Sequence, residues 1–247
     1  MKVHIMESSE AIAAQVASQI ISEVQNNYNC VLGLATGSSV IGIYEQLVKD
    51  HIKNRTSYKG VKTFNLDEYC GISSLRCQSF CSFMNEKLFK YIDINKNNIY
   101  IPNGNSGNLN AECDKYEQLI KDSPIDIQVL GIGANGHIGF NEPGTSFESS
   151  THIIKLHDKT REDNSRFFSC MSEVPAKAIT MGIKTILSAK RIILVAMGES
   201  KAKAVKQMIE GSLSTECPAS ALQTHPNAHI YLDTAAAKLL KQKIYIY

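Results

Sequence analysis

Apolar and polar positions along the chain follow two patterns, one typical of buried strands and one typical of amphipathic helices. Short apolar runs such as Cys30–Ala35 indicate strands buried on both faces, and segments such as Ala11–Val24 repeat apolar residues at helical spacing. The predicted strands are Val3–Ile5, Cys30–Ala35, Thr63–Leu66, Ile125–Leu130, Ile192–Met197 and His229–Leu232. The predicted helices are Ala11–Val24, Ile41–Val48, Phe80–Phe89, Ala111–Ile120, Ile179–Leu187 and Ala202–Ile209.

This alternation of strands and helices predicts an α/β fold, with a mainly parallel sheet and helices on both of its faces. A chain of 247 residues is long enough for one such domain, and it shows no internal repeat, linker or low-complexity segment. We therefore expect a single domain over residues 1–247. The polar segment from about 156 to 176 interrupts the pattern, and it is either a plain surface excursion or a lid over a site.

The composition of the chain limits the kinds of partner that the protein is expected to bind and the cellular compartment in which it is expected to lie. A net charge of +2 gives no case for nucleic acid or for an anionic membrane. The N-terminus lacks the apolar core of a signal peptide, and no apolar stretch approaches the roughly 20 residues that a membrane helix needs. Seven cysteines, an odd number, suit reduced thiols in a cytoplasm. Cys77 and Cys81 have no Cys/His pair at zinc-site spacing, so we expect no metal.

Four polar loops follow predicted strands and precede predicted helices: Thr36–Ser39, Asp67–Tyr69, Asn135–Glu142 and Gly198–Lys201. In an open parallel sheet the carboxyl ends of the strands lie along one edge, and ligands bind in the crevice there. Chance could place one polar loop in this way. Four together predict a single composite site.

The loops Thr36–Ser39 and Gly198–Lys201 have the chemistry of an anion site. Free backbone N–H groups at the start of a helix, together with the helix dipole, attract phosphate. The alternatives are that Ser38 or Ser39 simply caps the helix and that Lys201 is a solvated side chain. Neither loop is a dinucleotide fingerprint or a Walker loop, so a phosphate monoester is a better candidate ligand than a nucleotide.

The segment Ile125–Gly144, which reads IDIQVLGIGANGHIGFNEPG, carries candidate proton-transfer groups. An imidazole such as His137, with the carboxylate of Glu142 in reach, is suited to moving protons near neutral pH. The alternative is a glycine-rich turn with an incidental histidine. Asp67 and Glu68 follow another strand, where a carboxylate facing the crevice could remove a proton next to a carbonyl, or could only cap a helix or face solvent.

Motifs along nearly the whole chain resemble those of the glucosamine-6-phosphate deaminases, also called glucosamine-6-phosphate isomerases. They are LGLATGSS, FNLDEY, SFMNEKLF, GIGANGHIGFNEPGTSF, DNSRFF, TMGIKTILSA, VAMGESKAKAV and ASALQTHP. The resemblance implies a Rossmann-like α/β sandwich that converts glucosamine 6-phosphate and water to fructose 6-phosphate and ammonia in amino sugar catabolism. It implies no metal or organic cofactor, a small-molecule sugar phosphate as partner, and a monomer or homo-oligomer.

The resemblance also implies roles for single residues of the proton-transfer machinery. Asp67 matches the base that moves a proton between C2 and C1 of the sugar, and His137 matches the group that assists opening of the pyranose ring. Glu142 and Asn135 match the positions that orient and tune this histidine. Other members carry Asp where this chain has Asn135, and Asn cannot hold a charge. Glu142 is then the ionisable partner of His137 within the motif.

For the substrate phosphate, the resemblance implies two kinds of contact. Gly37, Ser38 and Ser39 match a backbone loop, whereas Arg166 and Lys201 match side-chain cations. Arginine suits this role because its planar fork pairs with two phosphate oxygens. Since Arg166 lies inside the suspected lid, phosphate binding would help to close that segment over the substrate.

The same resemblance bears on regulation. In allosterically activated members, an Arg and a Lys two positions apart follow the NEP loop and hold the phosphate of N-acetylglucosamine 6-phosphate. Here His152 and Ile154 occupy those places, and only a one-residue shift would bring Lys155 into the role. An isoleucine cannot bind phosphate, and an imidazole is mostly neutral near pH 7. We therefore expect little response to that effector.

Two other functions compete with the deaminase interpretation. A 6-phosphogluconolactonase resembles this family in fold and has a related GxxxDGH-type loop, but it does not usually continue into HIGFNEPG. Hydrolysis of a lactone also has no evident use for Asp67 and Glu68. A regulatory domain that binds sugar phosphates without catalysis is the third possibility. Such a protein would typically carry a DNA-binding module or lack proton-transfer residues, whereas this chain keeps Asp67 and His137.

Overall fold

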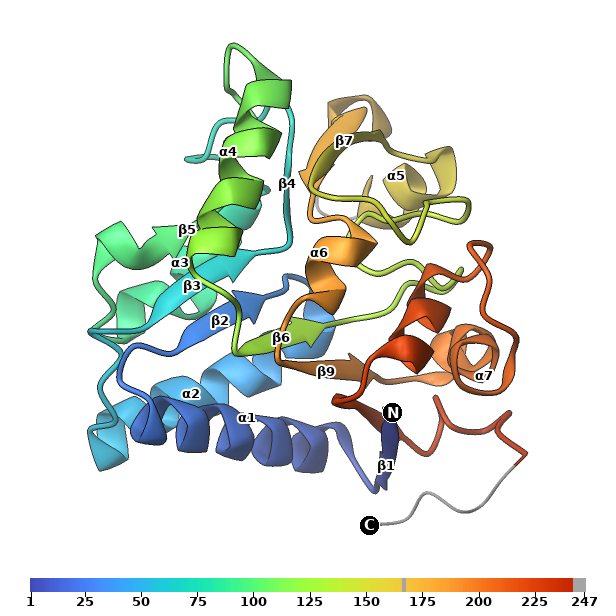
Figure 1. Cartoon of the computed structure of the whole chain (residues 1–247), viewed down its shortest axis with the longest axis horizontal. Helices are drawn as coiled ribbons and strands as arrows, with labels where there is room; N and C mark the ends of the chain where they lie inside the picture. Colours follow the sequence, from blue (N-terminus) through green and yellow to red (C-terminus); the bar gives the residue numbers. More distant parts are fainter. Residues whose placement is uncertain (166–167, 242–247) are drawn as a thin grey trace.

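The computed structural model describes residues 1–165 and 168–241, and a seven-stranded sheet forms its centre (Figure 1). In spatial order the strands are β1 (Lys2–Met6), β10 (Ala228–Asp233), β9 (Arg191–Ala196), β6 (Ile127–Leu130), β2 (Val31–Leu34), β3 (Lys62–Asn65) and β5 (Ile99–Tyr100). Every neighbouring pair in this sheet runs parallel. The predicted fold class, an α/β chain built on a mainly parallel sheet, is confirmed.

Helices cover both faces of this sheet. In Figure 1, α1 and α2 run side by side along one face, and α4 and α6 lie on the other side. The helices are α1 (Ser9–Asn26), α2 (Ile41–Asn54), α3 (Phe80–Lys87), α4 (Leu109–Asp122), α5 (Asp158–Ser165), α6 (Ile183–Leu187) and α7 (Ala202–Glu210), with short 3-10 turns at Ser38–Val40, Phe89–Tyr91, Lys96–Asn98, Met171–Glu173, Glu199–Lys201 and Pro218–Thr224. No helix in the described part of the chain is long and apolar enough to cross a membrane.

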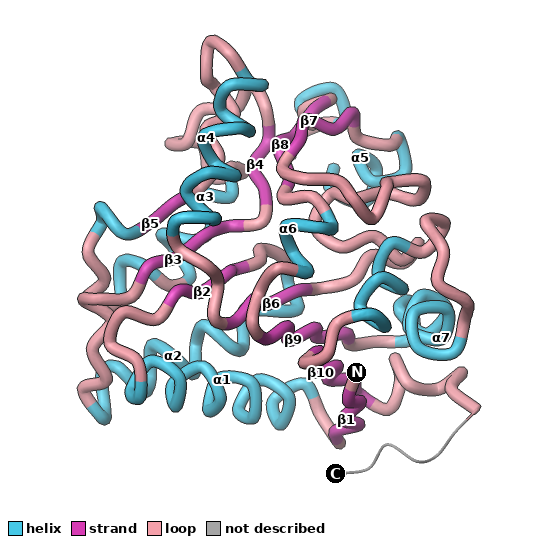
Figure 2. Tube along the Cα trace, viewed as in Figure 1, coloured by secondary structure: helices cyan, strands magenta, loops and turns pink. Residues whose placement is uncertain are grey.

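A second, smaller sheet was not predicted from the sequence. It is antiparallel and consists of β4 (Asp67–Tyr69), β8 (Lys177–Thr180) and β7 (His152–Lys155), set apart from the main sheet beside α4 and α5 (Figure 2). The helix predicted at Ile179–Leu187 is therefore wrong at its start, because Ile179 and Thr180 belong to β8. The small sheet packs through a separate apolar cluster of Tyr69, Ile72, Phe140, Leu156 and Ala178.

The order of the strands places the ligand crevice. The chain passes from β2 outward to β3 and β5 on one side, whereas β6, β9 and β10 lie on the other side of β2. In open α/β sheets, ligands bind outside the carboxyl ends of the strands where the order reverses in this way. Here that point lies between β2 and β6, and the loops that follow β2, β6 and β9 are neighbours.

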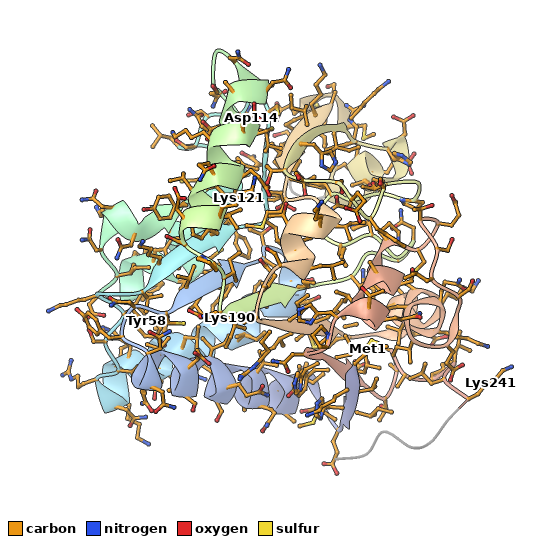
Figure 3. The ribbon with its side chains drawn as sticks, viewed as in Figure 1. Met1, Tyr58, Asp114, Lys121, Lys190 and Lys241 are labelled. Carbon is orange, nitrogen blue, oxygen red and sulfur yellow. The ribbon has the colours of Figure 1, made fainter. Side chains whose placement is uncertain are left out.

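The opposite edge of the sheet is closed by structural contacts. Asp126, just before β6, is 8% exposed and accepts a hydrogen bond from the Val31 N–H at 2.8 Å. The ammonium of Lys190, labelled in Figure 3, donates to the other oxygen of the same carboxylate at 2.7 Å. These contacts fix the starts of β2, β6 and β9. The loops that are open to a ligand are therefore those that follow these strands, at the carboxyl edge of the sheet.

Candidate active site

The loop that carries His137 begins where β6 ends and runs to β7. The sequence predicts a helix after Asn135–Glu142, and this is wrong, because the next regular element is strand β7. Gly133 makes room for the histidine, since a Cβ there would lie 2.2 Å from Cε1 of the His137 ring. The backbone folds back on itself through a hydrogen bond from the Gly133 N–H to the His137 carbonyl at 2.9 Å. The imidazole is therefore seated directly over the end of the buried strand.

Glu142 is the buried partner of this histidine. Its side chain is 1% exposed, and its Oε2 lies 3.6 Å from Nδ1 of His137. This separation is beyond hydrogen-bonding length, so the two groups attract as an ion pair when the imidazole is protonated. Burial alone would raise the pKa of Glu142, but contacts with His137, Thr160 and Asn135 outweigh burial and lower the pKa to about 2. Glu142 is therefore an anion throughout the neutral range.

Asn135 connects the histidine and the glutamate through both ends of its amide. Its Nδ2 donates to Oε2 of Glu142 at 2.8 Å, and its Oδ1 accepts from the His137 backbone N–H at 3.3 Å. An aspartate at this position would bring a second negative charge against Glu142. The amide instead fixes the geometry without adding charge, which is the chemistry of an orienting residue.

Asp67 and Glu68 have different surroundings, because successive residues of a strand point to opposite faces. Glu68 accepts hydrogen bonds from the N–H groups of Phe80 at 3.0 Å and Cys81 at 2.9 Å, so it holds the start of α3. Asp67 is 7% exposed, and burial, together with the negative charge of Glu68, raises its pKa to about 8. Glu68 therefore has the helix-capping role that the sequence left open for this pair, whereas Asp67 has the properties of a base.

The strand opposite Asp67 joins it to the histidine loop. Thr180 pairs with Asp67 in the small sheet, and its hydroxyl accepts a hydrogen bond from the Phe140 N–H at 3.1 Å. Gly139 has φ +56°, and a Cβ at this position would lie 3.4 Å from Oδ2 of Asp67 and 3.0 Å from Oγ1 of Thr180. Asn141 strengthens the junction by donating to the Met181 carbonyl at 2.8 Å. Asp67 therefore lies directly against the loop that carries His137.

Two further loops at the same edge have the same backbone design. Gly37 after β2 and Gly198 after β9 both have positive φ, +100° and +87°, and each leads into a single 3-10 turn followed by α2 or α7. Positive φ is the region that glycine adopts readily. Because β9, β6 and β2 are neighbours in the sheet, these loops flank the histidine loop on its two sides.

The side-chain capping alternative for the first loop is wrong. In the described part of the chain, no side chain forms a capping hydrogen bond at the 3-10 turn Ser38–Val40 or at α2. The second loop is anchored differently, because the Asp233 carboxylate at the end of β10 accepts from the Gly198 N–H at 2.9 Å. Lys201 is the last residue of the second 3-10 turn and directly precedes α7.

The structure brings together most of the predicted site residues. Asp67, Asn135, His137 and Glu142 lie on two adjoining segments, and Gly37, Ser38, Ser39 and Lys201 lie on the two flanking loops. Arg166 lies outside the described residues. Among those that are described, no group of three or more His, Cys, Asp and Glu side chains could hold a metal ion.

Two contacts of the site had no signal in the sequence. Thr180 and Thr160 both bond to the histidine loop, to the Phe140 N–H and to the Glu142 carboxylate respectively. Neither residue lies in a loop that follows a predicted strand, where the sequence indicates a site. A threonine within a strand or a polar helix is ordinary, so only the tertiary structure reveals these contacts.

The chain and its fold belong to one known class of proteins. The family model described as glucosamine-6-phosphate isomerases/6-phosphogluconolactonase matches residues 6–231, and the chain belongs to that family. Within the family it is similar to the glucosamine-6-phosphate deaminase of Geobacillus sp. (strain WCH70), with 48% identity over 240 residues that cover 96% of each chain. It is also 47% identical to glucosamine-6-phosphate deaminase 1 of Bacillus subtilis (strain 168), covering 97% of this chain and 98% of the relative.

Solved structures agree with this placement. A monomeric glucosamine-6-phosphate deaminase of the NagB superfamily matches with a TM-score of 0.95 and 46% identity, covering 97% of this chain and 100% of that one. The 6-phosphogluconolactonase of Trypanosoma cruzi matches with a TM-score of 0.78, covering 98% of this chain and 97% of that one, but with only 16% identity. The second likeness is one of fold alone.

Proposed function

We propose that this protein converts glucosamine 6-phosphate and water to fructose 6-phosphate and ammonia. The identity of 46–49% to deaminases over nearly the full chain supports this activity. The observation that carries the proposal is the placement of Asp67, a buried carboxylate with a raised pKa, against the loop of His137 and Glu142. An aldose-to-ketose conversion needs a carbon base and a separate group that serves the ring oxygen, and these two places supply them.

The reaction begins with opening of the pyranose ring. His137 delivers a proton to the ring oxygen as the C1 hydroxyl loses one, which leaves an aldehyde at C1. Glu142, held in one orientation by Asn135, supports the protonated imidazole during this step, since an anion at 3.6 Å favours the cationic form. The side chain of His137 is 25% exposed, so the ring of a bound sugar has access to it.

Asp67 carries out the steps on carbon. Its carboxylate removes the proton from C2 to give an enolamine and returns that proton to C1, which gives an iminium at C2. Water then adds to this carbon, and ammonia leaves as the ketone forms. A carboxylic acid with a pKa of about 8 retains the abstracted proton better than an ordinary aspartic acid, which has a value of 3.8. Burial therefore suits Asp67 to a shuttle between neighbouring carbons.

The two flanking loops supply the phosphate site of this proposal. The backbone N–H groups at Gly37, Ser38 and Ser39 open a helix, where the dipole favours an anion. Lys201 on the other loop, and Arg166 from the segment 156–176, would add charge-assisted hydrogen bonds. That segment would act as a lid. Its described part is anchored on the site by Leu156, which is 2% exposed in the apolar cluster of the small sheet.

Replacing Lys201 by alanine is expected to raise KM for glucosamine 6-phosphate by about 10- to 150-fold, because a charge-assisted bond to phosphate is worth roughly 1.5–3 kcal/mol. The effect on kcat should be small, and Arg166→Ala should behave in the same way. Steady-state kinetics provide the measurement, with Lys203→Ala as control, since Lys203 is an exposed lysine of α7, two residues after Lys201. Unchanged binding of a phosphorylated inhibitor to Lys201→Ala would place the anion site elsewhere.

The enzyme is expected to follow hyperbolic kinetics and to ignore N-acetylglucosamine 6-phosphate at millimolar concentration. Ile154 packs against the apolar cluster of the small sheet, and Nδ1 of His152 is engaged with the Ser150 carbonyl at 2.8 Å. Lys155 lies on the opposite face of β7 from both, because side chains of a strand alternate. Rates measured against substrate concentration, with and without the effector, decide the matter. A sigmoidal curve that the effector makes hyperbolic would contradict the prediction.

A coupled assay for fructose 6-phosphate distinguishes the competing functions. Formation of fructose 6-phosphate and ammonia from glucosamine 6-phosphate supports the deaminase. Hydrolysis of 6-phosphogluconolactone without deamination would identify a lactonase instead, and binding of sugar phosphates without turnover would identify a regulatory domain. A cytoplasmic location and the choice between monomer and homo-oligomer stay predictions.

A further inference from the structure

Helix α5 reaches into the active site through one hydroxyl group. The helix reads DKTREDNS and has no apolar residue, yet its Thr160 is only 6% exposed. The Thr160 hydroxyl donates a hydrogen bond to Oε1 of Glu142. The next residue, Arg161, connects the same helix to the segment that follows it by donating to the Val174 carbonyl at 3.0 Å. Burial of apolar surface therefore does not explain why Thr160 points inward. Its hydrogen bond to the Glu142 carboxylate does explain this orientation.

The two oxygens of Glu142 have separate partners. Oε2 accepts from Asn135 and lies 3.6 Å from Nδ1 of His137, whereas Oε1 accepts from Thr160. The terminal torsion of a glutamate side chain is broad, so a carboxylate held at one oxygen can still rotate. A bond at each oxygen removes that freedom. Nδ1 of His137 has no hydrogen-bond partner among the described residues, so its interaction with Oε2 depends on the direction of the carboxylate.

We propose that Thr160 is a positioning residue for His137, which acts by holding Oε1 of Glu142 so that Oε2 faces the imidazole. The inference rests on the proposed function, in which His137 opens the pyranose ring. Without the hydroxyl, the carboxylate turns away from Nδ1, and the protonated imidazole loses support. Proton transfer at the ring oxygen then slows. The steps on C1 and C2 keep their rate, because Asp67 is held on a different strand, β4.

A purely structural role for Thr160 predicts a different result. In that case the hydroxyl only anchors α5, and its loss would lower the stability of the helix and affect every substrate equally. The chain offers a matched comparison in Thr185, which is 2% exposed and donates to Oε2 of Glu117 at 2.8 Å. Thr185→Val removes a half-buried hydrogen bond from threonine to glutamate, away from the histidine loop.

The test compares Thr160→Val, Thr160→Ser and Thr185→Val with the unaltered enzyme on two substrates. One is glucosamine 6-phosphate, and the other is its analogue without the hydroxyls at C4 and C5, which can close neither a pyranose nor a furanose ring. For Thr160→Val we expect kcat on the closed sugar to fall by about 10-fold with KM within about twofold, as the loss of a hydrogen bond to a charged group implies. On the open-chain analogue, its kcat should remain within about twofold of the unaltered enzyme. Thr160→Ser keeps the hydroxyl and should have nearly the kcat of the unaltered enzyme. Thr185→Val should leave kcat unchanged on both substrates.

Three results would overturn the inference: an unchanged kcat in Thr160→Val, an equal loss on both substrates, or a serine variant as slow as the valine variant. Partial misfolding of Thr160→Val would lower the rates on both substrates by the same factor, so the ratio of the two rates still distinguishes positioning from a structural role. Failure of the proposed function is recognised separately, because the unaltered enzyme would then release no ammonia from glucosamine 6-phosphate.

Discussion

Replacing Asp67 by asparagine is expected to reduce kcat by about 10²- to 10⁴-fold and to leave KM within a few fold. Asparagine has nearly the same shape but cannot accept the C2 proton, so only an interaction used in the transition state is lost. In deuterated water part of the abstracted proton exchanges with solvent while Asp67 holds it, so the unaltered enzyme should introduce some solvent-derived deuterium at C1 of the product, and the variant should introduce none. A variant with normal kcat would remove Asp67 from the mechanism.

The pH dependence provides a second measurement on the same residue. The base acts when deprotonated, so kcat/KM should rise as pH increases through about 8, the pKa of Asp67 in the free enzyme. Part of that pKa comes from the charge of Glu68, and Glu68→Gln should therefore move the rise in kcat/KM to lower pH. Titration of the substrate amine is common to both enzymes, so only the difference between the two profiles is assigned to Asp67.

Stability shows whether the Asp67→Asn variant is folded. Because the pKa of Asp67 is higher in the folded state than its ordinary value of 3.8, the folded protein holds this proton more tightly than the unfolded chain. The contribution of the protonated carboxyl to stability is therefore lost progressively between about pH 4 and pH 8. Asparagine does not ionise, so at pH 8 the variant should unfold at a temperature no lower than the unaltered enzyme.

The second large effect is expected for His137→Gln, which should slow reaction of the closed pyranose by about 10²- to 10⁴-fold, the range typical of proton-transfer groups. The open-chain analogue should lose much less, because ring opening is the step assigned to the imidazole. In the unaltered enzyme His137 helps to lower the pKa of Glu142 to about 2, so the variant leaves a buried carboxyl group without the partner that most favours its charged form. Some loss of stability is expected for this reason.

The matched control for this variant is His157→Gln. His157 is exposed at the start of the segment 156–176, and its contact with α5 runs through its backbone carbonyl, which accepts from the Arg161 N–H at 3.0 Å. Its replacement should leave both substrates unaffected. Equal losses on the closed and open-chain sugars for His137→Gln would contradict the ring-opening role and would assign His137 to a step that both substrates share.

The sequence by itself determined six of the seven strands of the main sheet and the edge at which the candidate site lies. Strands buried on both faces leave continuous apolar runs, and helices on a sheet repeat apolar residues at their own period, so β2, β6 and β9 and the helices α2, α3 and α4 were recognisable. The carboxyl ends of parallel strands share an edge, and this rule placed the loops at Gly37, His137 and Lys201 together. Each of these signals comes from residues that are close together in the chain, so a single sequence is enough to recognise it.

Only the tertiary structure decided the small antiparallel sheet and what it does. Its strands β4, β7 and β8 are short and come from distant parts of the chain, so no local period reveals that Asp67 pairs with Thr180. The same pairing separates Asp67 from Glu68, since one is buried against the histidine loop and the other accepts the N–H groups that open α3.

The pKa of Asp67, the proposed base, could not be predicted from the sequence either. A pKa depends on burial, neighbouring charge and hydrogen bonds, all of which arise from contacts between segments far apart in the chain. Asp67 has a raised pKa and Glu142 a lowered one, although both are buried carboxyl groups. The sequence identified both residues, and their opposite electrostatic surroundings follow from packing. For Glu142 that packing includes Thr160, a contact from a polar helix that no pattern in the chain indicates.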